Sequence, residues 1–206
     1  MNEKIIYDVL IIGAGAAGYG TALTLASVED RFDWSRNKKY LMIDDGQSDI
    51  LKASFFNLAA VDFGIGGDRL LMKMKEQIDN FQNCNIENDT VISIENIENN
   101  YKVIAKNKAY EAKIVVIATG MHRFDIKCDG ITVSAHKNVM KSGNIFLENN
   151  DNKIKDGLYV AGLASGKPTM FAIANGDGVK VACDIFKEWT GKSFVAHDLL
   201  SNAKVL

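Results

Sequence analysis

The chain has 206 residues, of which 47% are hydrophobic and 24% are charged. A chain of this length and composition predicts one globular domain, or one domain with a small appendage, that buries a core without a metal or disulfide staple. Its formal net charge of −2, from mixed signs, gives no positive field that would gather nucleic acid or an anionic membrane.

The first part of the chain predicts alternating strands and helices. Residues 4–12 form a nearly continuous run of apolar, mostly β-branched residues, typical of a central parallel strand covered on both faces. Residues 16–28 place small and apolar side chains at helical spacing, and a second strand follows at residues 40–44 after a polar surface excursion at 29–39. Residues 68–81 predict an amphipathic helix.

The second part predicts a small meander and two further buried strands. Residues 84–113 alternate strand-like runs with asparagine-rich turns, which is the signature of an antiparallel meander. Residues 114–118 and 157–163 are short buried strands, residues 121–156 are polar and irregular, and residues 170–189 form a long final helix. We therefore expect one α/β domain over residues 1–206, with a doubly wound, Rossmann-like parallel sheet, helices on one face and the meander on the other.

A G-x-G-x-x-G motif, Gly13, Gly15 and Gly18, lies between the first strand and the first helix. The first glycine permits the tight turn, the second lets the backbone approach a pyrophosphate, and the third lets helix and strand pack closely. The helix N-terminus favours an anion at this point. Asp44 and Asp45 end the second strand, where such a site needs an acid for a ribose hydroxyl, and their charge disfavours a 2′-phosphate. These residues alone leave NAD and FAD both open.

Three segments in order resemble the FAD domain of thioredoxin reductase and its relatives in the two-dinucleotide-binding flavoprotein superfamily. They are GDRLLMKMKEQIDNF (67–81), YEAKIVVIATG (110–120) and the strand GLYVAG (157–162) before a long helix. The resemblance extends from Ile5 to about Trp189. It implies a non-covalent FAD-binding flavoprotein that transfers electrons or hydride as an oxidoreductase.

The resemblance also implies which positions contact FAD, from the adenosine to the flavin ring. They are Gly13, Gly15, Ala16, Ala17 and Gly18 at the pyrophosphate, Asp44 and Asp45 at the ribose, Val91 at the adenine, Gln47 and Asn57 along the ribityl and flavin side, Ala118, Thr119 and Gly120 in the next turn, and Gly162, Leu163, Met170, Phe171 and Ala172 near the flavin pyrimidine.

The chain departs from this family in four respects. Only residues 121–142 stand where thioredoxin reductase inserts its NADPH domain, and this is shorter than the roughly 30 residues of one βαβ unit. The C-x-x-C pair is missing, which excludes dithiol–disulfide exchange by neighbouring cysteines. Leu163 replaces the acid that holds the ribityl chain, and Met170-Phe171 replaces a polar pair. We therefore expect an external supply of electrons, from NAD(P)H or a redox partner protein, and name no catalytic side chain.

Two other classes of function stay open. One is a non-catalytic flavin- or nucleotide-binding module or subunit, and the other is an NAD-dependent enzyme with the same fingerprint. His122 and Arg123 either face the cofactor or belong to a solvated loop, and the apolar stretch at 53–65 is either core or an interface with a second subunit, as in a homodimer.

The remaining sequence features concern metals and location. Neither His136 nor His197 has a metal-ligand partner at useful spacing, so we expect no metal site. The three cysteines are odd in number and widely spaced, no run is long enough to span a membrane, and the first residues do not read as a signal peptide. A cytoplasmic location without membrane contact is the resulting expectation.

Overall fold

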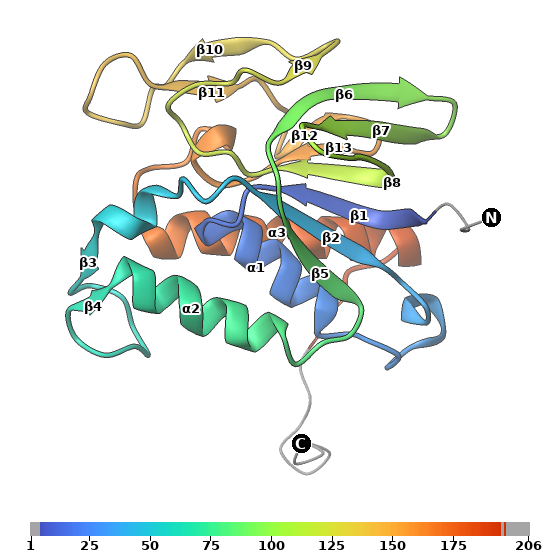
Figure 1. Ribbon diagram of the computed structural model, residues 1–206, viewed down its shortest axis with the longest axis horizontal. Helices are drawn as coiled ribbons and strands as arrows, with labels where there is room; N and C mark the ends of the chain where they lie inside the picture. Colours follow the sequence, from blue (N-terminus) through green and yellow to red (C-terminus); the bar gives the residue numbers. More distant parts are fainter. Residues whose placement is uncertain (1–4, 195, 197–206) are drawn as a thin grey trace.

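A parallel sheet of five strands forms the centre of the protein (Figure 1), as seen in a computed structural model that describes residues 5–194 and 196. Its order is β5 (Cys84–Asn88), β2 (Tyr40–Asp44), β1 (Ile6–Ile12), β8 (Ala109–Ile117) and β13 (Leu158–Val160). The predicted α/β class with a mostly parallel, Rossmann-like sheet is therefore confirmed. Most of β1 is buried, as its continuous apolar sequence predicts for a strand covered on both faces.

The long strand β8 pairs with two different strands along one edge. Its first half pairs antiparallel with β7 (Asn100–Ala105), which in turn pairs with β6 (Val91–Ile97). Its second half, from Val115 to Ile117, pairs in parallel with β13. The meander is thus β6, β7 and the start of β8. Our prediction that it begins at residue 84 is wrong, because residues 84–88 form β5 and pair in parallel with β2.

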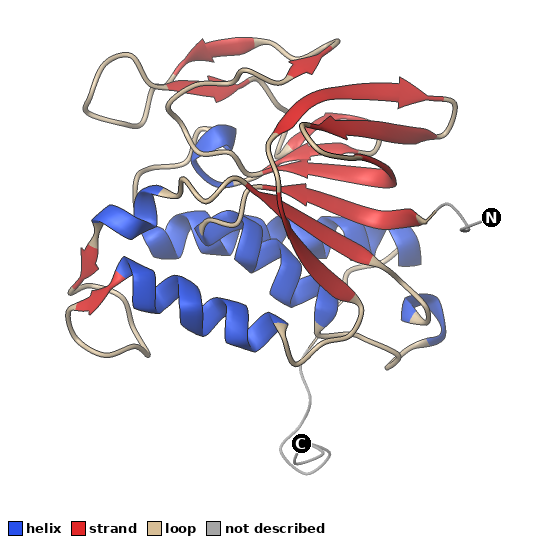
Figure 2. Ribbon diagram, viewed as in Figure 1, coloured by secondary structure: helices blue, strands red, loops and turns tan. Residues whose placement is uncertain are grey.

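Three helices cover one face of the sheet (Figure 2): α1 (Ala16–Ala26), α2 (Gly67–Ile78) and α3 (Phe171–Thr190). Helices α1 and α3 pack unusually close, because a Cβ at Gly178 would lie 2.0 Å from the carbonyl oxygen of Ala17. Across this contact the Thr21 hydroxyl donates to the Gly178 carbonyl at 3.0 Å, and the Asn175 amide donates to the Ala16 carbonyl at 2.9 Å. The close contact fixes the position of the α3 N-terminus relative to the glycine-rich loop.

Short elements complete the fold on the other face and around the edges. They are η1 (Asp33–Ser35), η2 (Asp49–Lys52), β3 (Ser54–Phe55), β4 (Ile65–Gly66), β9 (Lys127–Cys128), β10 (Val133–Ala135), β11 (Ile145–Leu147), β12 (Lys153–Lys155) and η3 (Gly162–Ser165). The hairpin of β10 and β11 lies on the face opposite the helices. Each face of the sheet has its own apolar core. Within the described part of the chain, no helix is long and apolar enough to cross a membrane.

Candidate functional site

A cavity of about 450 Å³ opens at the carboxyl ends of β1, β2 and β8. The glycine-rich loop, the segment from Asp44 to Ala53, the loop that follows β8, and the start of α3 form its walls. Ligands of open α/β sheets bind at this edge, because the loops after neighbouring parallel strands converge there. The cavity runs from a polar end at Asp44 and Asp45 to an apolar end near Leu163 and Phe171.

The three glycines of the loop have different roles in the structure. Gly13 has a φ of +104°, and a Cβ there would lie 2.5 Å from the Ala118 carbonyl oxygen. A Cβ at Gly18 would lie 1.9 Å from the Gly13 carbonyl oxygen, so both residues must be glycine for the fold itself. Gly15 is extended, with a φ of −90°, and a Cβ there would meet only the Ser48 hydroxyl at 3.6 Å. The space in front of Gly15 is therefore available to a ligand.

Gly15 is also the N-cap of α1 and has no side chain that could cap the helix. The first backbone N–H groups of a helix lack partners within the helix, and the helix dipole adds a partial positive charge there. An anion such as a pyrophosphate is thus favoured at this end of the cavity.

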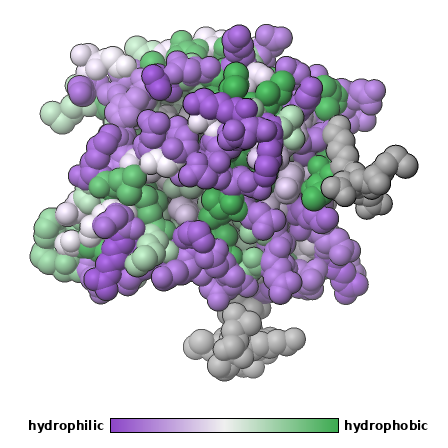
Figure 3. Space-filling model, viewed as in Figure 1, coloured by the Kyte–Doolittle hydropathy of each residue, from purple (hydrophilic) through white to green (hydrophobic). Residues whose placement is uncertain are grey.

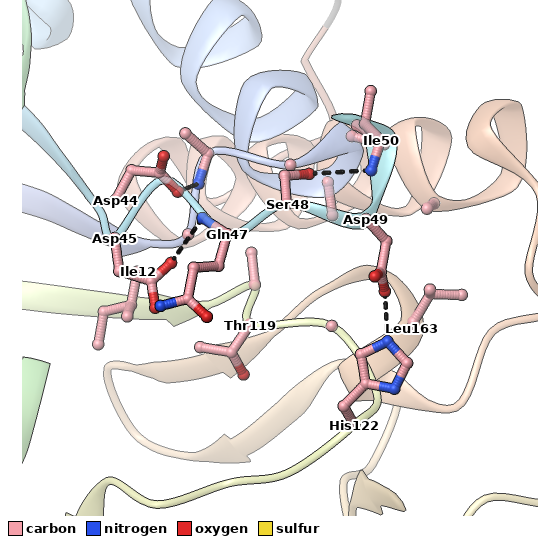
Figure 4. Close-up of a pocket in the computed structure, with 18 of the residues that line it drawn as sticks. Ile12, Asp44, Asp45, Gln47, Ser48, Asp49, Ile50, Thr119, His122 and Leu163 are labelled. Atoms are coloured by element: carbon pink, nitrogen blue, oxygen red, sulfur yellow. Dashed lines mark hydrogen bonds and ion pairs between the residues drawn. The ribbon is translucent and has the colours of Figure 1, made fainter. Parts of the chain in front are cut away.

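The carboxylate of Asp44 is hydrogen-bonded to the glycine-rich loop. Its Oδ1 accepts from the Ala14 N–H at 2.9 Å (Figure 4), and its Oδ2 accepts from the Gly46 N–H at 3.1 Å. The neighbouring Asp45 accepts from the Gln47 N–H at 3.1 Å and is exposed. Each carboxylate oxygen can accept more than one hydrogen bond, so both side chains retain capacity for ribose hydroxyls.

The other end of the cavity is apolar and suits a flat ring. Its lining side chains come from η2, β3, η3 and the start of α3: Ile50, Ala53, Phe55, Leu163, Met170, Phe171 and Ala174. The rings of Phe55 and Phe171 contact each other edge to face with centroids 5.5 Å apart.

His122, from the loop after β8, meets Asp49 of η2 at the rim of this apolar end. The Nε2 of His122 lies 2.5 Å from the Oδ2 of Asp49 (Figure 4), and its Nδ1 lies 3.1 Å from the Oδ1 of Asn144. Partial burial acts to raise the pKa of the Asp49 carboxyl, but hydrogen bonds from Lys52 and His122 outweigh it, so the net pKa is lowered. The sequence left two interpretations of His122 open, a residue that faces the cofactor or a residue of a solvated loop. In the structure His122 lines the cavity, and its side chain is also 57% exposed to solvent.

Most of the residues that the resemblance implied do line the cavity. They are Gly13, Gly15, Ala16, Ala17, Asp44, Asp45, Gln47, Val91, Ala118, Thr119, Gly120, Leu163, Met170 and Phe171. Gly18 and Gly162 are buried behind the lining instead. Asn57 is exposed in the loop between β3 and β4, and Ala172 is exposed on α3. Ala174 lines the cavity in place of Ala172, because two residues turn a helix by about 200°.

Several lining residues were not predicted as site residues: Ser48, Asp49, Asp89, Thr90, Phe124, Asp125 and Ile126. Asp89 follows β5, and the carboxyl end of β5 reaches the same sheet edge because this strand is parallel to β2. The assignment of residues 84–88 to the meander concealed that signal. The buried Asp89 carboxylate accepts from the N–H groups of Thr90 at 2.8 Å and Asn107 at 3.1 Å, which fixes the turn.

The chemistry of the cysteines is consistent with the missing C-x-x-C pair. Cys84, Cys128 and Cys183 are all free, and burial raises the pKa of the Cys84 thiol to about 12. A buried thiol with so high a pKa is a poor nucleophile. The described residues contain no group of three or more His, Cys, Asp or Glu side chains that could hold a metal ion.

Comparison with known proteins identifies a family and a fold. Residues 7–162 match the family model for pyridine nucleotide-disulphide oxidoreductases. A thioredoxin reductase structure from Gloeobacter violaceus aligns with a TM-score of 0.74 at 15% identity, over 96% of this chain and 99% of the other. A ferredoxin-flavin thioredoxin reductase from Clostridium acetobutylicum aligns with a TM-score of 0.67 at 17% identity, over 90% and 99% of the two chains. The comparison with curated proteins gives no match. The resemblance inferred from the sequence is confirmed.

Proposed function

Because the chain belongs to the pyridine nucleotide-disulphide oxidoreductase family, we propose that it binds FAD non-covalently in this cavity and acts as a flavin oxidoreductase. The single observation that carries the proposal is the free space at Gly15, directly before the N-terminus of α1. It leaves room for a pyrophosphate between a polar end that suits an adenosine ribose and an apolar end that suits a ring system.

The residues present fit an extended dinucleotide. Asp44 and Asp45 would hold the ribose, Gly15 and the first turn of α1 the pyrophosphate, and Phe55 and Phe171 would pack beside the ring. FAD supplies hydride and one-electron chemistry when bound, and the protein supplies binding, orientation and electrostatics. Leu163 offers no carboxylate to the ribityl group of FAD. The polar side chains that the protein would present to FAD are therefore concentrated at the adenosine end of the cavity.

Spectroscopy of the purified full-length protein tests this proposal. We expect a visible flavin absorption band, release of FAD on denaturation, and tight rebinding of added FAD. Gly15→Val should abolish FAD binding while the protein stays folded, because the added side chain fills the pyrophosphate site without a backbone clash. Gly176→Ala is the matched control, since a Cβ there meets nothing within 4 Å and the residue does not line the cavity. Binding of NADH by a colourless protein that refuses FAD would contradict the proposal and favour an NAD-dependent enzyme.

The electron donor is proposed to be external, either NAD(P)H or a redox partner protein. One structural neighbour is a ferredoxin-flavin thioredoxin reductase, which makes reduced ferredoxin a further donor to test. Anaerobic addition of NADH, NADPH or reduced ferredoxin to the FAD-loaded protein should bleach the flavin band with one of the three.

A non-catalytic flavin-binding module is the second candidate function. It is favoured by Leu163 and the Met170-Phe171 pair, which offer no polar side-chain contacts to a flavin. In that case the FAD-loaded protein would keep its colour with all three donors.

We also propose that the loop between β3 and β4 contributes to a homodimer in the cytoplasm. Hydrophobic side chains gather over β3 and β4 at the left of the space-filling view (Figure 3). Phe56 and Phe63 are 62% and 84% exposed and contact each other edge to face. Light scattering should give a dimer mass that Phe63→Ser reduces to that of the monomer.

A further inference from the structure

The contact between Asp49 and His122 joins the two sides of the cavity mouth. Asp49 belongs to η2, in the segment that follows β2, whereas His122 belongs to the loop that follows β8. Both residues line the cavity, yet their side chains are 43% and 57% exposed, so they stand at its boundary with solvent. In Figure 4 the two side chains point towards each other beside Leu163.

His122 is held from both sides by oxygen atoms. The buried Asn144 side chain has its orientation fixed, because its Nδ2 donates to the Lys141 carbonyl at 2.8 Å. Its Oδ1 therefore faces the Nδ1 of His122, while Asp49 faces the Nε2. An imidazole ring between two acceptors donates through both nitrogens only in its charged form. The three side chains thus make a continuous chain of hydrogen bonds from Asn144, directly before β11, through the loop after β8, to η2.

The segment that carries Asp49 lies between two fixed elements, the paired strand β2 and the part of η2 that packs on α2. Beyond Asp49 the chain packs tightly on α2, since a Cβ at Gly67 would lie 1.6 Å from the Ile50 carbonyl oxygen, and Gly67 donates to the Ala53 carbonyl at 2.9 Å. Before Asp49, residues 45–47 are exposed. Gly46 has a φ of +74° with nothing within 4 Å of a Cβ. The stretch from Asp45 to Gln47 is held by local hydrogen bonds, from the Gly46 N–H to Asp44 and from the Gln47 N–H to Asp45, so the contact between Asp49 and His122 is its link to the loop after β8.

From this geometry we propose that Asn144, His122 and Asp49 form a clasp that closes the cavity over its bound dinucleotide, so that opening the clasp controls how fast the dinucleotide leaves. The clasp residues are positioning residues, since they act by holding the segment from Gly46 to Asp49 against the loop after β8. The proposal rests on the proposed function, because FAD is the dinucleotide it would retain.

Stopped-flow fluorescence of FAD with the full-length protein measures the rate at which FAD dissociates. Asp49→Asn and His122→Ala should each raise the FAD dissociation rate about two- to fivefold, the effect expected for loss of an exposed ion pair. The double variant should be no faster than either single variant, and Asp49→Glu should restore slow release. Lys52→Met is the matched control, because Lys52 pairs with the same carboxylate at 3.0 Å but does not line the cavity. Its dissociation rate should equal that of the original protein.

Two kinetic results would overturn the clasp. One is a dissociation rate unchanged in both Asp49→Asn and His122→Ala. The other is an increase of the same size in Lys52→Met, which would show that charge on η2, and not the contact with His122, sets the rate.

Failure of FAD to bind the original protein would instead overturn the proposed function, and the clasp then has a separate readout. Hydrogen exchange of the ligand-free protein at residues 46–50 should be faster in Asp49→Asn and His122→Ala than in the original protein and Lys52→Met. Equal exchange in all four would overturn the clasp as well.

Discussion

The Asp177 carboxylate of α3 accepts a hydrogen bond from the backbone N–H of Gly162 at 2.7 Å and so ties the last helix to the turn after β13. The same Oδ2 accepts from the Asn152 amide at 2.8 Å and the Ser165 hydroxyl at 2.7 Å, and Lys167 lies 3.3 Å from Oδ1. Asp177 is buried and does not line the cavity. This one carboxylate therefore fixes the η3 turn, which presents Leu163 to the apolar end of the site.

Asp177→Ala should lower the free energy of unfolding by about 3 kcal/mol, because it removes the acceptor of the buried Gly162 N–H and of the buried Asn152 amide. Urea denaturation followed by circular dichroism measures the change. Asp184→Ala, on the same helix, is the control: its side chain is 35% exposed and pairs with Lys180, so its loss should cost less than about 1 kcal/mol. Equal losses in the two variants would show that the network around Asp177 is not a major source of stability.

Gly18→Ala should destabilise the protein by about 3 kcal/mol, because its Cβ would overlap the Gly13 carbonyl oxygen and force α1 away from β1. Gly176→Ala should be neutral or stabilising by up to about 1 kcal/mol, since it lies in open space within α3. Thermal melting of the two variants distinguishes them. A Gly18→Ala protein as stable as the original would contradict the close packing at the loop.

Asp8→Asn should destabilise the protein at pH 7 and do so less at pH 3. Burial acts to raise the pKa of Asp8, but hydrogen bonds from Lys113, the Lys39 N–H and Lys38 outweigh it, and the net pKa is lowered. A carboxylate with a lowered folded pKa stabilises the protein above its unfolded pKa of about 3.9, and this stability is lost as the pH falls through the folded pKa. We expect a loss of about 2 kcal/mol at pH 7 from denaturation curves.

The matched control for this pH dependence is Asp33→Asn. Asp33 pairs with Arg36, but its side chain is 93% exposed, so neither its stability nor its pH profile should differ from the original protein. An Asp8→Asn loss that is equal at pH 3 and pH 7 would contradict the role of the carboxylate charge.

Trp34→Ala should destabilise the protein by about 2 kcal/mol, because Trp34 packs among Phe32, Phe186 and Phe194 with ring centroids 5.7, 5.3 and 5.0 Å away. The intrinsic fluorescence of Trp189 during urea unfolding measures this change in the free energy of unfolding. A change below about 0.5 kcal/mol would show that this aromatic cluster is peripheral to the fold.

Local sequence pattern was sufficient where the local environment determines structure. Strand β1 and helix α1 follow from a continuous apolar run, three glycines and helical spacing, and β2 has the bounds expected from its sequence. The pairing partners of the strands were harder to predict, because whether a strand joins a parallel sheet or a meander depends on contacts between residues distant in the sequence. For this reason the place of β5, and with it Asp89 at the cavity, was missed.

The same limit applies to side chains that act at long range. Asp177 reads as an ordinary polar position of a helix, and only the fold brings it to Gly162. The stretch at 29–39 reads as a polar excursion, yet Trp34 packs against Phe186 and Trp189 near the C-terminal end of α3. Asn57 was predicted as a cofactor contact from the family resemblance alone, and in the structure it is exposed in the loop between β3 and β4.

The divided edge of β8 has a consequence for protein engineering. Between Ile117 and Leu158 the chain adds two short strands to the sheet, β9 beside β6 and β12 beside β13, and β13 then pairs with the second half of β8. Met140, at the tip of the intervening hairpin, is fully exposed. Because the loop that carries Met140 joins β10 and β11, which form a separate two-stranded sheet, a foreign module with closely spaced ends grafted there should leave the pairing of β8 with β13 in place.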